Sequence, residues 1–142
     1  MVKRILAGVL GVVSAGITIW IVEYVGHIVY PPPQGLDFAN AEAMGAYVET
    51  LPTGALLFPV IAWIVGTFDG VLVAALVARA VPFVYAGVVG GLVLLATIAN
   101  IAMIPHPVWV PIVAVPGIAL AALGGALMGR RFVSPGEPAP PG

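Results

Sequence analysis

The chain consists mainly of four long apolar runs, and its polar residues lie mostly between them. The runs cover residues 5–30, 51–78, 83–104 and 108–128. An α-helix rises ~1.5 Å per residue, so about 20 apolar residues cross the ~30 Å hydrocarbon core of a bilayer. Membrane-spanning strands are about 10 residues long and alternate in polarity, and these runs do neither. The pattern therefore predicts an all-α polytopic membrane protein with four transmembrane helices.

A shorter pattern occupies the loop 31–50, which joins the first two runs. The loop begins with three prolines, which cannot continue a helix, and Asp37 or Asn40 can cap a new one. Four apolar residues then follow at helical spacing: Met44, Tyr47, Val48 and Leu51. We expect a short interfacial helix on the outer surface, with its apolar side toward the bundle.

Composition agrees with a membrane protein and excludes several other classes. Of 142 residues, 61% are hydrophobic and 8% are charged, whereas a soluble domain carries about 25% charged residues. A net charge of −1 provides no basic surface for nucleic acid, and the absence of cysteine excludes disulfides and thiolate metal sites. We expect one transmembrane domain over 1–130 and a flexible cytoplasmic tail over 131–142, which is rich in proline and glycine.

All five basic residues are predicted to lie on one side of the membrane. They precede the first run, separate the second and third runs, or follow the fourth run: Lys3, Arg4, Arg79, Arg130 and Arg131. Basic residues favour the cytoplasmic side, so both termini are expected there, in a bacterial inner membrane. The first apolar run is too long for a cleaved signal peptide, so we expect it to be a retained span.

Small residues recur at four-residue steps in three of the runs. They are Ala7, Gly11 and Ala15 in the first, Ala62, Gly66, Gly70, Ala74 and Ala78 in the second, and Gly117, Ala121, Gly125 and Gly129 in the fourth. Such lines let helix backbones approach closely in lipid. They fit either a bundle packed within the chain or a surface that docks another membrane protein or a second copy.

A shift of 79 residues superimposes part of the first run on the third without a gap. The aligned identities are Ala7, Gly8, Val9, Gly11, Thr18, Ile19 and His27 with Ala86, Gly87, Val88, Gly90, Thr97, Ile98 and His106. Such internal similarity suggests two duplicated helical hairpins in parallel orientation.

Ionisable residues gather at the outer end of the first and third runs. Glu23 and His27 are four residues apart and therefore share one helix face. His106 ends the third run on the same side, and Asn100 lies about a turn and a half deeper. Ionisable groups in membrane spans are candidates for function.

Three interpretations fit this cluster. In the first, Glu23 and His27 bond each other in an interfacial network beside the belt aromatics Tyr24, Tyr30 and Trp109. In the second, Glu23, His27 and His106 bind a divalent metal. In the third, one or both histidines ligate a porphyrin-type pigment, haem or chlorophyll.

Asp69 is expected near the cytoplasmic boundary of the second run. Counting from Leu51 places it close to the inner end of that span. An interfacial ion pair with one of four basic residues is its expected role: Lys3, Arg4, Arg79 or Arg130.

The segments EYVGHIVYPPPQGLD, LPTGALL and IPHPVW together resemble a group of small four-span bacterial membrane proteins. Those proteins share a Glu-x3-His pattern, a Tyr-Pro turn and a later His-Pro-x-Trp. The resemblance implies one outer-face unit, without naming a reaction, made of Glu23, Gly26, His27, Tyr30, Pro31, His106, Pro107 and Trp109.

The sequence contains no evident catalytic constellation, so an enzyme is disfavoured. Our first hypothesis is an accessory or assembly subunit of a larger membrane complex, surrounded by lipid and bound to a membrane-protein partner or to itself. The alternative is a metal- or cofactor-binding protein built on Glu23, His27 and His106. A small transporter ranks third, because no charged pair is expected near the midplane.

Overall fold

The structure, a computed structural model that describes residues 2–79 and 82–132, confirms the all-helical class. Four segments are long and apolar enough to cross a membrane. Three are single helices: α1 (Val2–Val29), α3 (Thr53–Ala78) and α6 (Trp109–Phe132). The other span comprises α4 (Pro82–Tyr85), the π-helical turn η1 (Ala86–Gly90) and α5 (Gly91–Met103). The remaining helix, α2 (Ala41–Thr50), lies in the loop between α1 and α3.

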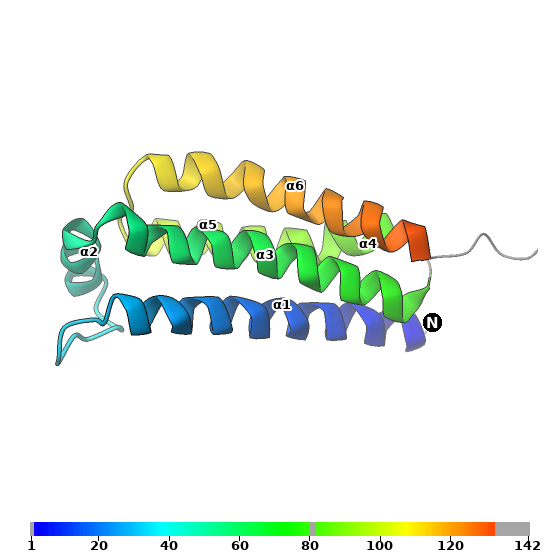
Figure 1. Cartoon of the computed structure of the whole chain (residues 1–142), viewed down its shortest axis with the longest axis horizontal. Helices are drawn as coiled ribbons and strands as arrows, with labels where there is room; N and C mark the ends of the chain where they lie inside the picture. The colour runs from blue at the N-terminus through cyan, green and yellow to red at the C-terminus, as the bar shows by residue number, and fades with distance from the viewer. Residues whose placement is uncertain (1, 80–81, 133–142) are drawn as a thin grey trace, which may run out of the picture.

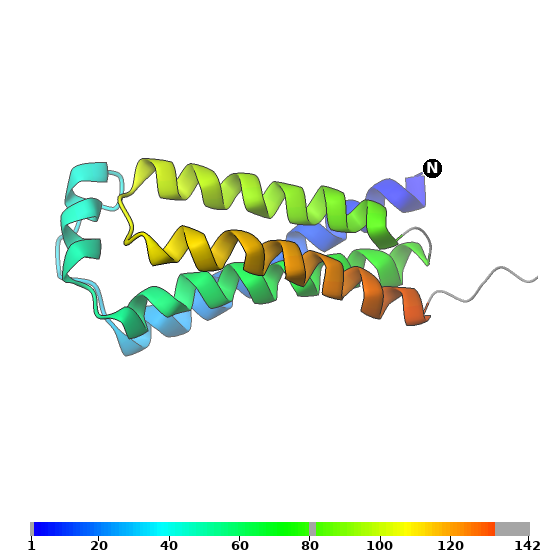
Figure 2. The ribbon, with the colours of Figure 1, turned by 90° about the horizontal axis from the view of Figure 1, so that it is seen from above.

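The four spans run side by side along the long axis of the molecule, and α3 is the central one (Figure 1). α3 packs mainly against α1 on one side and α6 on the other. α2 lies across one end of the bundle, as Figure 2 shows from above. The fold therefore has a capped end and an opposite end where α1 begins and α3 and α6 end.

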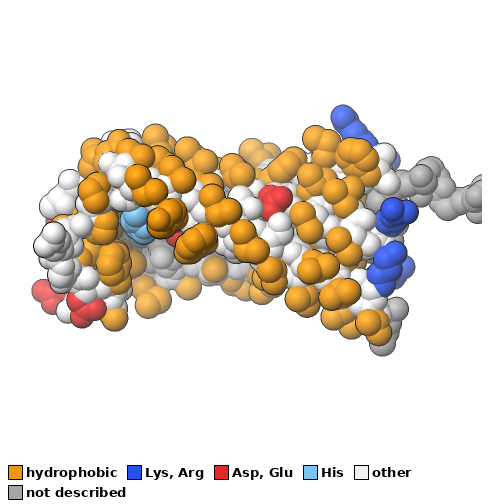
Figure 3. Space-filling model, turned by 60° about the horizontal axis from the view of Figure 1, so that its bottom comes forward, with side chains coloured by type: hydrophobic (Ala, Val, Ile, Leu, Met, Phe, Trp, Pro, Cys, Tyr) orange, Lys and Arg blue, Asp and Glu red, His pale blue; other side chains and the backbone are white. Residues whose placement is uncertain are grey.

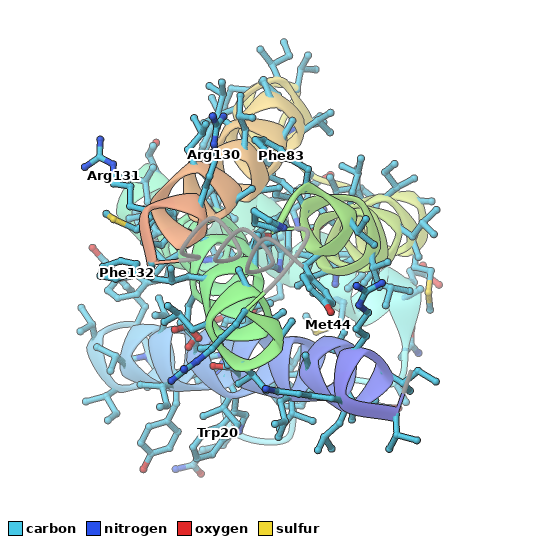
Figure 4. The ribbon with its side chains drawn as sticks, turned by 90° about the vertical axis from the view of Figure 1, so that its right-hand side faces the viewer. Trp20, Met44, Phe83, Arg130, Arg131 and Phe132 are labelled. Carbon is cyan, nitrogen blue, oxygen red and sulfur yellow. The ribbon has the colours of Figure 1, made fainter. Side chains whose placement is uncertain are left out.

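Charge divides between these two ends. Figure 3 shows an apolar surface along the middle of the molecule, with basic side chains at the end opposite α2. Arg130 and Arg131 lie in the last turn of α6, and Figure 4 shows both of them from that end. Arg79 follows α3 in a left-handed conformation with φ 52°, which ends that helix. This distribution is the one that the positive-inside rule uses to orient a bundle.

The backbones of α1 and α3 meet at two glycines. A Cβ added to Gly11 would lie 2.5 Å from the carbonyl oxygen of Gly70, and one added to Gly70 would lie 2.5 Å from that of Gly11. Val89 of η1 contacts the same place, because its side chain lies 3.3 Å from the Gly11 position and 3.0 Å from the Gly70 position. Neither glycine has room for a side chain, so three spans meet at this point.

The glycines of α6 face the opposite side of α3. A Cβ on Gly125 would lie 2.7 Å from the Phe68 carbonyl oxygen, and one on Gly117 would lie 2.5 Å from Ile64 Cδ1. Gly66 of α3 faces α1 instead, 2.9 Å from the Ala15 carbonyl oxygen. The small residues that could have formed a docking surface therefore face other helices of the same chain.

The span that contains α5 is attached at one end and loosely packed at the other. Tyr85 is buried, and its hydroxyl donates a hydrogen bond of 3.2 Å to the carbonyl oxygen of Arg4. Within α5, by contrast, Thr97 is the buried residue. The π-helical turn between these two parts was not expected from the sequence. α5 therefore diverges from α1 toward the α2 end, as Figure 2 shows.

The helix bounds agree closely with the predicted spans. The short helix expected in the loop 31–50 is confirmed as α2, and its cap is Asn40, whose side-chain oxygen accepts hydrogen bonds from the backbone of Glu42 at 3.0 Å and Ala43 at 3.1 Å. α6 continues through Arg131 and Phe132, two residues into the predicted tail. The rest of that tail lies outside the described residues.

The contact between α1 and α3 can be tested with Gly70→Ala. Because the new methyl group would lie 2.5 Å from a backbone oxygen, we expect unfolding free energy in detergent to fall by ~1–3 kcal/mol. The matched control is Gly16→Ala, since a Cβ there meets nothing within 4 Å and alanine favours a helix. Circular dichroism during denaturant titration measures both, and equal stability of the two variants would contradict the contact.

Candidate functional site

A cavity of about 170 Å³ lies beneath α2, between the ends of α1 and α5 and the start of α3. We call it the α2 cavity. Its polar lining residues come from four separate segments. Glu23 and His27 belong to α1, and Tyr30 follows directly after that helix; the others are Tyr47 of α2, Asn100 of α5, and His106 in the link before α6. The apolar wall includes Met44, Val48, Leu56, Phe58 and Trp63.

Gly26 sets the distance between α1 and the start of α3 at this end. A Cβ on Gly26 would lie 2.8 Å from Phe58 Cβ, so α1 packs directly on that phenylalanine. The ring of Tyr30 meets Phe58 edge-on at a centroid distance of 6.1 Å. Its hydroxyl oxygen would lie 2.5 Å from a Cβ on Gly54. These contacts hold the helix face that presents Glu23 and His27 against α3.

His106 is held by its own backbone. Its Nδ1 lies 2.6 Å from the carbonyl oxygen of Ile104, and a carbonyl can only accept, so Nδ1 carries the hydrogen and donates it. In the tautomer that carries its hydrogen on Nδ1 alone, Nε2 can accept a hydrogen bond or ligate a metal. The link that carries His106 also packs on α2, because a Cβ on Gly45 would lie 3.2 Å from Pro105 Cδ.

The structure brings Glu23, His27, Asn100 and His106 to one cavity. The residues are not, however, joined in the expected way. Within residues 2–79 and 82–132, no hydrogen bond or ion pair connects Glu23 to His27, so the first interpretation of the cluster is not supported in that form. In the same ranges, no three His, Asp or Glu side chains are arranged to hold a metal ion.

The cavity volume bears on the pigment hypothesis. An engineered cavity of ~150 Å³ takes up benzene, and the α2 cavity is of that size. A porphyrin contains four pyrrole rings and is several times larger than benzene. The α2 cavity therefore does not enclose a haem or a chlorophyll, although a metal stays a prediction.

Two of the predicted belt aromatics lie outside the cavity. Tyr24 stacks on Trp20 at a centroid distance of 5.4 Å, and both are exposed on α1. Figure 4 shows that Trp20 points away from the bundle. Trp109 packs instead against the apolar cluster formed by Val60, Trp63, Val110, Ala114 and Ile118.

Asp69 forms a second polar site, between α1 and α3. Its Oδ2 accepts a hydrogen bond of 2.5 Å from the Ser14 hydroxyl and one of 3.0 Å from the Thr18 hydroxyl. Both donors lie near the middle of α1, and Asp69 lies about 13 Å before the end of α3. Asp69 is half-buried, so part of it faces the apolar exterior.

The expected ion pair of Asp69 with Lys3, Arg4, Arg79 or Arg130 is therefore wrong for the part of the chain that the structure describes. The reason is geometric. Because α1 and α3 approach closely at Gly11 and Gly70, the next turns of α1 lie beside Asp69. The hydroxyls of Ser14 and Thr18 on those turns are therefore its nearest donors. The basic residues lie at the end of the bundle, at least two turns of helix away.

Sequence reasoning missed Ser14, Thr18, Tyr47 and Trp63 as parts of sites. Ser14 and Thr18 are four residues apart and share a helix face, which is the signal that could have suggested a shared partner. No comparable signal exists for Trp63. Tyr47 was expected on the side of its helix that faces the bundle, but the residues that it meets there depend on where α2 folds over α3. Comparison of the chain with protein-family models, curated proteins and solved structures found no match.

Thr18→Val tests the Asp69 site. Because it removes one donor from a carboxylate within the membrane, we expect it to lower unfolding free energy by about 1 kcal/mol. The matched control is Thr97→Val, since the Thr97 hydroxyl is buried, with 2% of the residue exposed, and has no partner among the described residues. Removing an unpaired hydroxyl leaves stability unchanged or raises it. Equal losses in both variants would contradict the Asp69 site.

Proposed function

We propose that this protein is an integral membrane helix bundle that binds a small ligand in the α2 cavity. The observation that supports this most directly is the convergence of Glu23, His27, Asn100 and His106 on one cavity from three separate segments. A purely structural network would satisfy these groups with one another. His106 instead donates a hydrogen bond from Nδ1 to the carbonyl oxygen of Ile104. Its other ring nitrogen, Nε2, takes no part in that bond.

The composition of the cavity matches a binding site. Ligand sites combine apolar walls with a few convergent polar groups that orient the ligand. Here a carboxylate, an amide and two imidazoles provide both donors and acceptors, and Leu56, Phe58 and Trp63 provide the apolar wall. A divalent metal is one form that this ligand could take, and it would require Glu23, His27 and His106 to move together.

We infer that the cavity opens on the outer side of a bacterial inner membrane. This orientation rests on the positive-inside rule. Every basic residue lies at the end opposite α2, whereas Asp37, Glu42 and Glu49 lie in or beside α2. Both termini would then be cytoplasmic, and the ligand would be one available outside the cytoplasm.

A second candidate function is that of an accessory or assembly subunit. Its earlier support, the lines of small residues, is weakened because those residues pack within the chain. The specific observation that favours it now is Asp69, a half-buried carboxylate within an apolar span. Such a group is costly beside lipid, and a donor from a partner helix or from a second copy would satisfy it.

Native mass spectrometry of gently extracted protein tests ligand binding. We expect a small bound molecule in the wild type and about tenfold weaker binding in Glu23→Gln, because leaving a buried hydrogen-bonding group of the ligand without its partner costs ~1–3 kcal/mol. Glu42→Gln is the matched control, since Glu42 is exposed on α2 and does not line the cavity. An empty wild-type protein, or equal binding in both variants, would count against the proposal.

Asp69→Leu tests the subunit hypothesis. If a partner helix covers the carboxylate, a stoichiometric complex in the native membrane should dissociate when Asp69 is replaced. Thr18→Val is the control, because it disturbs the hydrogen bonds within the chain but keeps the carboxylate. Chemical cross-linking before extraction measures the complex. A complex that survives Asp69→Leu, or a wild-type protein that is monomeric in the membrane, would oppose this function.

A further inference from the structure

The α2 cavity is covered at its outer end and bounded by diverging helices at its side. α2 lies across the end of the bundle, and its residues Met44, Tyr47 and Val48 line the cavity (Figure 2). α2 is also packed on the link before α6 through Gly45 and Pro105. A ligand arriving along the bundle axis from the water would meet this helix first.

The side of the cavity is formed by α1 and α5, which separate toward the α2 end. Near the other end the two spans are joined, since Tyr85 bonds to Arg4 and Val89 packs between Gly11 and Gly70. Beyond that point α5 buries little of its surface. In Figure 4, viewed along the bundle, Met44 of α2 falls between α1 and the span that contains α5.

The polarity of the lining changes with depth. Asn100 and Glu23 lie about 4 Å and 9 Å below the ends of α5 and α1, in the outer turns of these helices next to α2. Trp63 lies about 15 Å below the start of α3 and therefore deeper in the bundle. The cavity therefore presents its polar groups toward the α2 end and an apolar floor deeper in the bundle.

We propose that the ligand of the α2 cavity is an amphiphile of the outer leaflet, which enters sideways from the bilayer between α1 and α5. Its polar head contacts Glu23, His27, Asn100 or His106, and one chain or ring extends toward Trp63. A volume of about 170 Å³ holds a portion about as large as benzene, so the remainder stays in the leaflet. This inference rests on the proposed function, because it names the class of ligand and its route.

Quenching of Trp63 fluorescence by brominated lipid tests the route. The protein contains three tryptophans, so Trp20→Phe with Trp109→Phe leaves Trp63 as the reporter. Trp63 is 7% exposed and faces the cavity. In vesicles of phosphatidylcholine brominated on its acyl chains, we expect Trp63 to be quenched nearly as strongly as Trp20, which is 65% exposed on α1. The quenching of Trp20 is measured in a second variant, in which Trp63 and Trp109 are replaced by phenylalanine instead.

A pair of variants separates entry into the cavity from quenching at a distance. Asn100→Phe places a bulky ring on the α5 wall of the cavity and should remove most of the quenching of Trp63 relative to unbrominated vesicles. Ile98→Phe adds a similar ring to α5 at a position that is 48% exposed and does not line the cavity, so quenching should persist. Absence of Trp63 quenching both by brominated phospholipid and by a prenyl quinone added to unbrominated vesicles, or quenching that is the same in both variants, would overturn the proposal.

Failure of the lateral route can be distinguished from failure of ligand binding itself. If Trp63 is not quenched while Glu23→Gln still weakens binding of a co-purified molecule, the ligand comes from the water and the lateral route alone is wrong. If quenching fails and no bound molecule is found, both proposals are wrong. If a prenyl quinone added to unbrominated vesicles quenches Trp63 and brominated phospholipid does not, the amphiphile is of the quinone class and the route is retained.

Discussion

The fold depends on the contact between the backbones of α1 and α3 at Gly11 and Gly70. In lipid, apolar side chains gain little by leaving the solvent, so helices associate through close packing and hydrogen bonds. A pair of glycines without space for a Cβ allows that packing. Val89 of the third span packs against the same two positions, so this contact places three of the four spans.

The same contact determines where the structure is open. The third span is held near Gly11 by η1 and near Arg4 by Tyr85, and beyond these points α5 buries little. A helix attached at one end and free of small-residue contacts at the other diverges from its neighbour. The α2 cavity occupies the resulting space, and α2 covers it.

Polar groups occur at two depths and are satisfied differently. Deep between α1 and α3, Asp69 accepts hydrogen bonds from Ser14 and Thr18. Near the α2 end, Glu23, Asn100 and His106 face a cavity. A polar group without a partner is costly in the membrane, so the two hydroxyl donors of the first site stabilise the bundle, and the second site is the one where we propose that a ligand binds.

The sequence by itself determined the class, the four spans, the common side of the basic residues and the capped helix after Asn40. These features follow from hydrophobic length and local hydrogen bonding, which neighbouring residues decide. It also named Glu23, His27, Asn100 and His106, because polar residues are conspicuous in apolar runs. Only the tertiary structure decided which small-residue lines meet, that Asp69 pairs with hydroxyls, and that Tyr47 and Trp63 complete a cavity. Those outcomes depend on the rotation and crossing of whole helices, which are set by packing between residues distant in the chain.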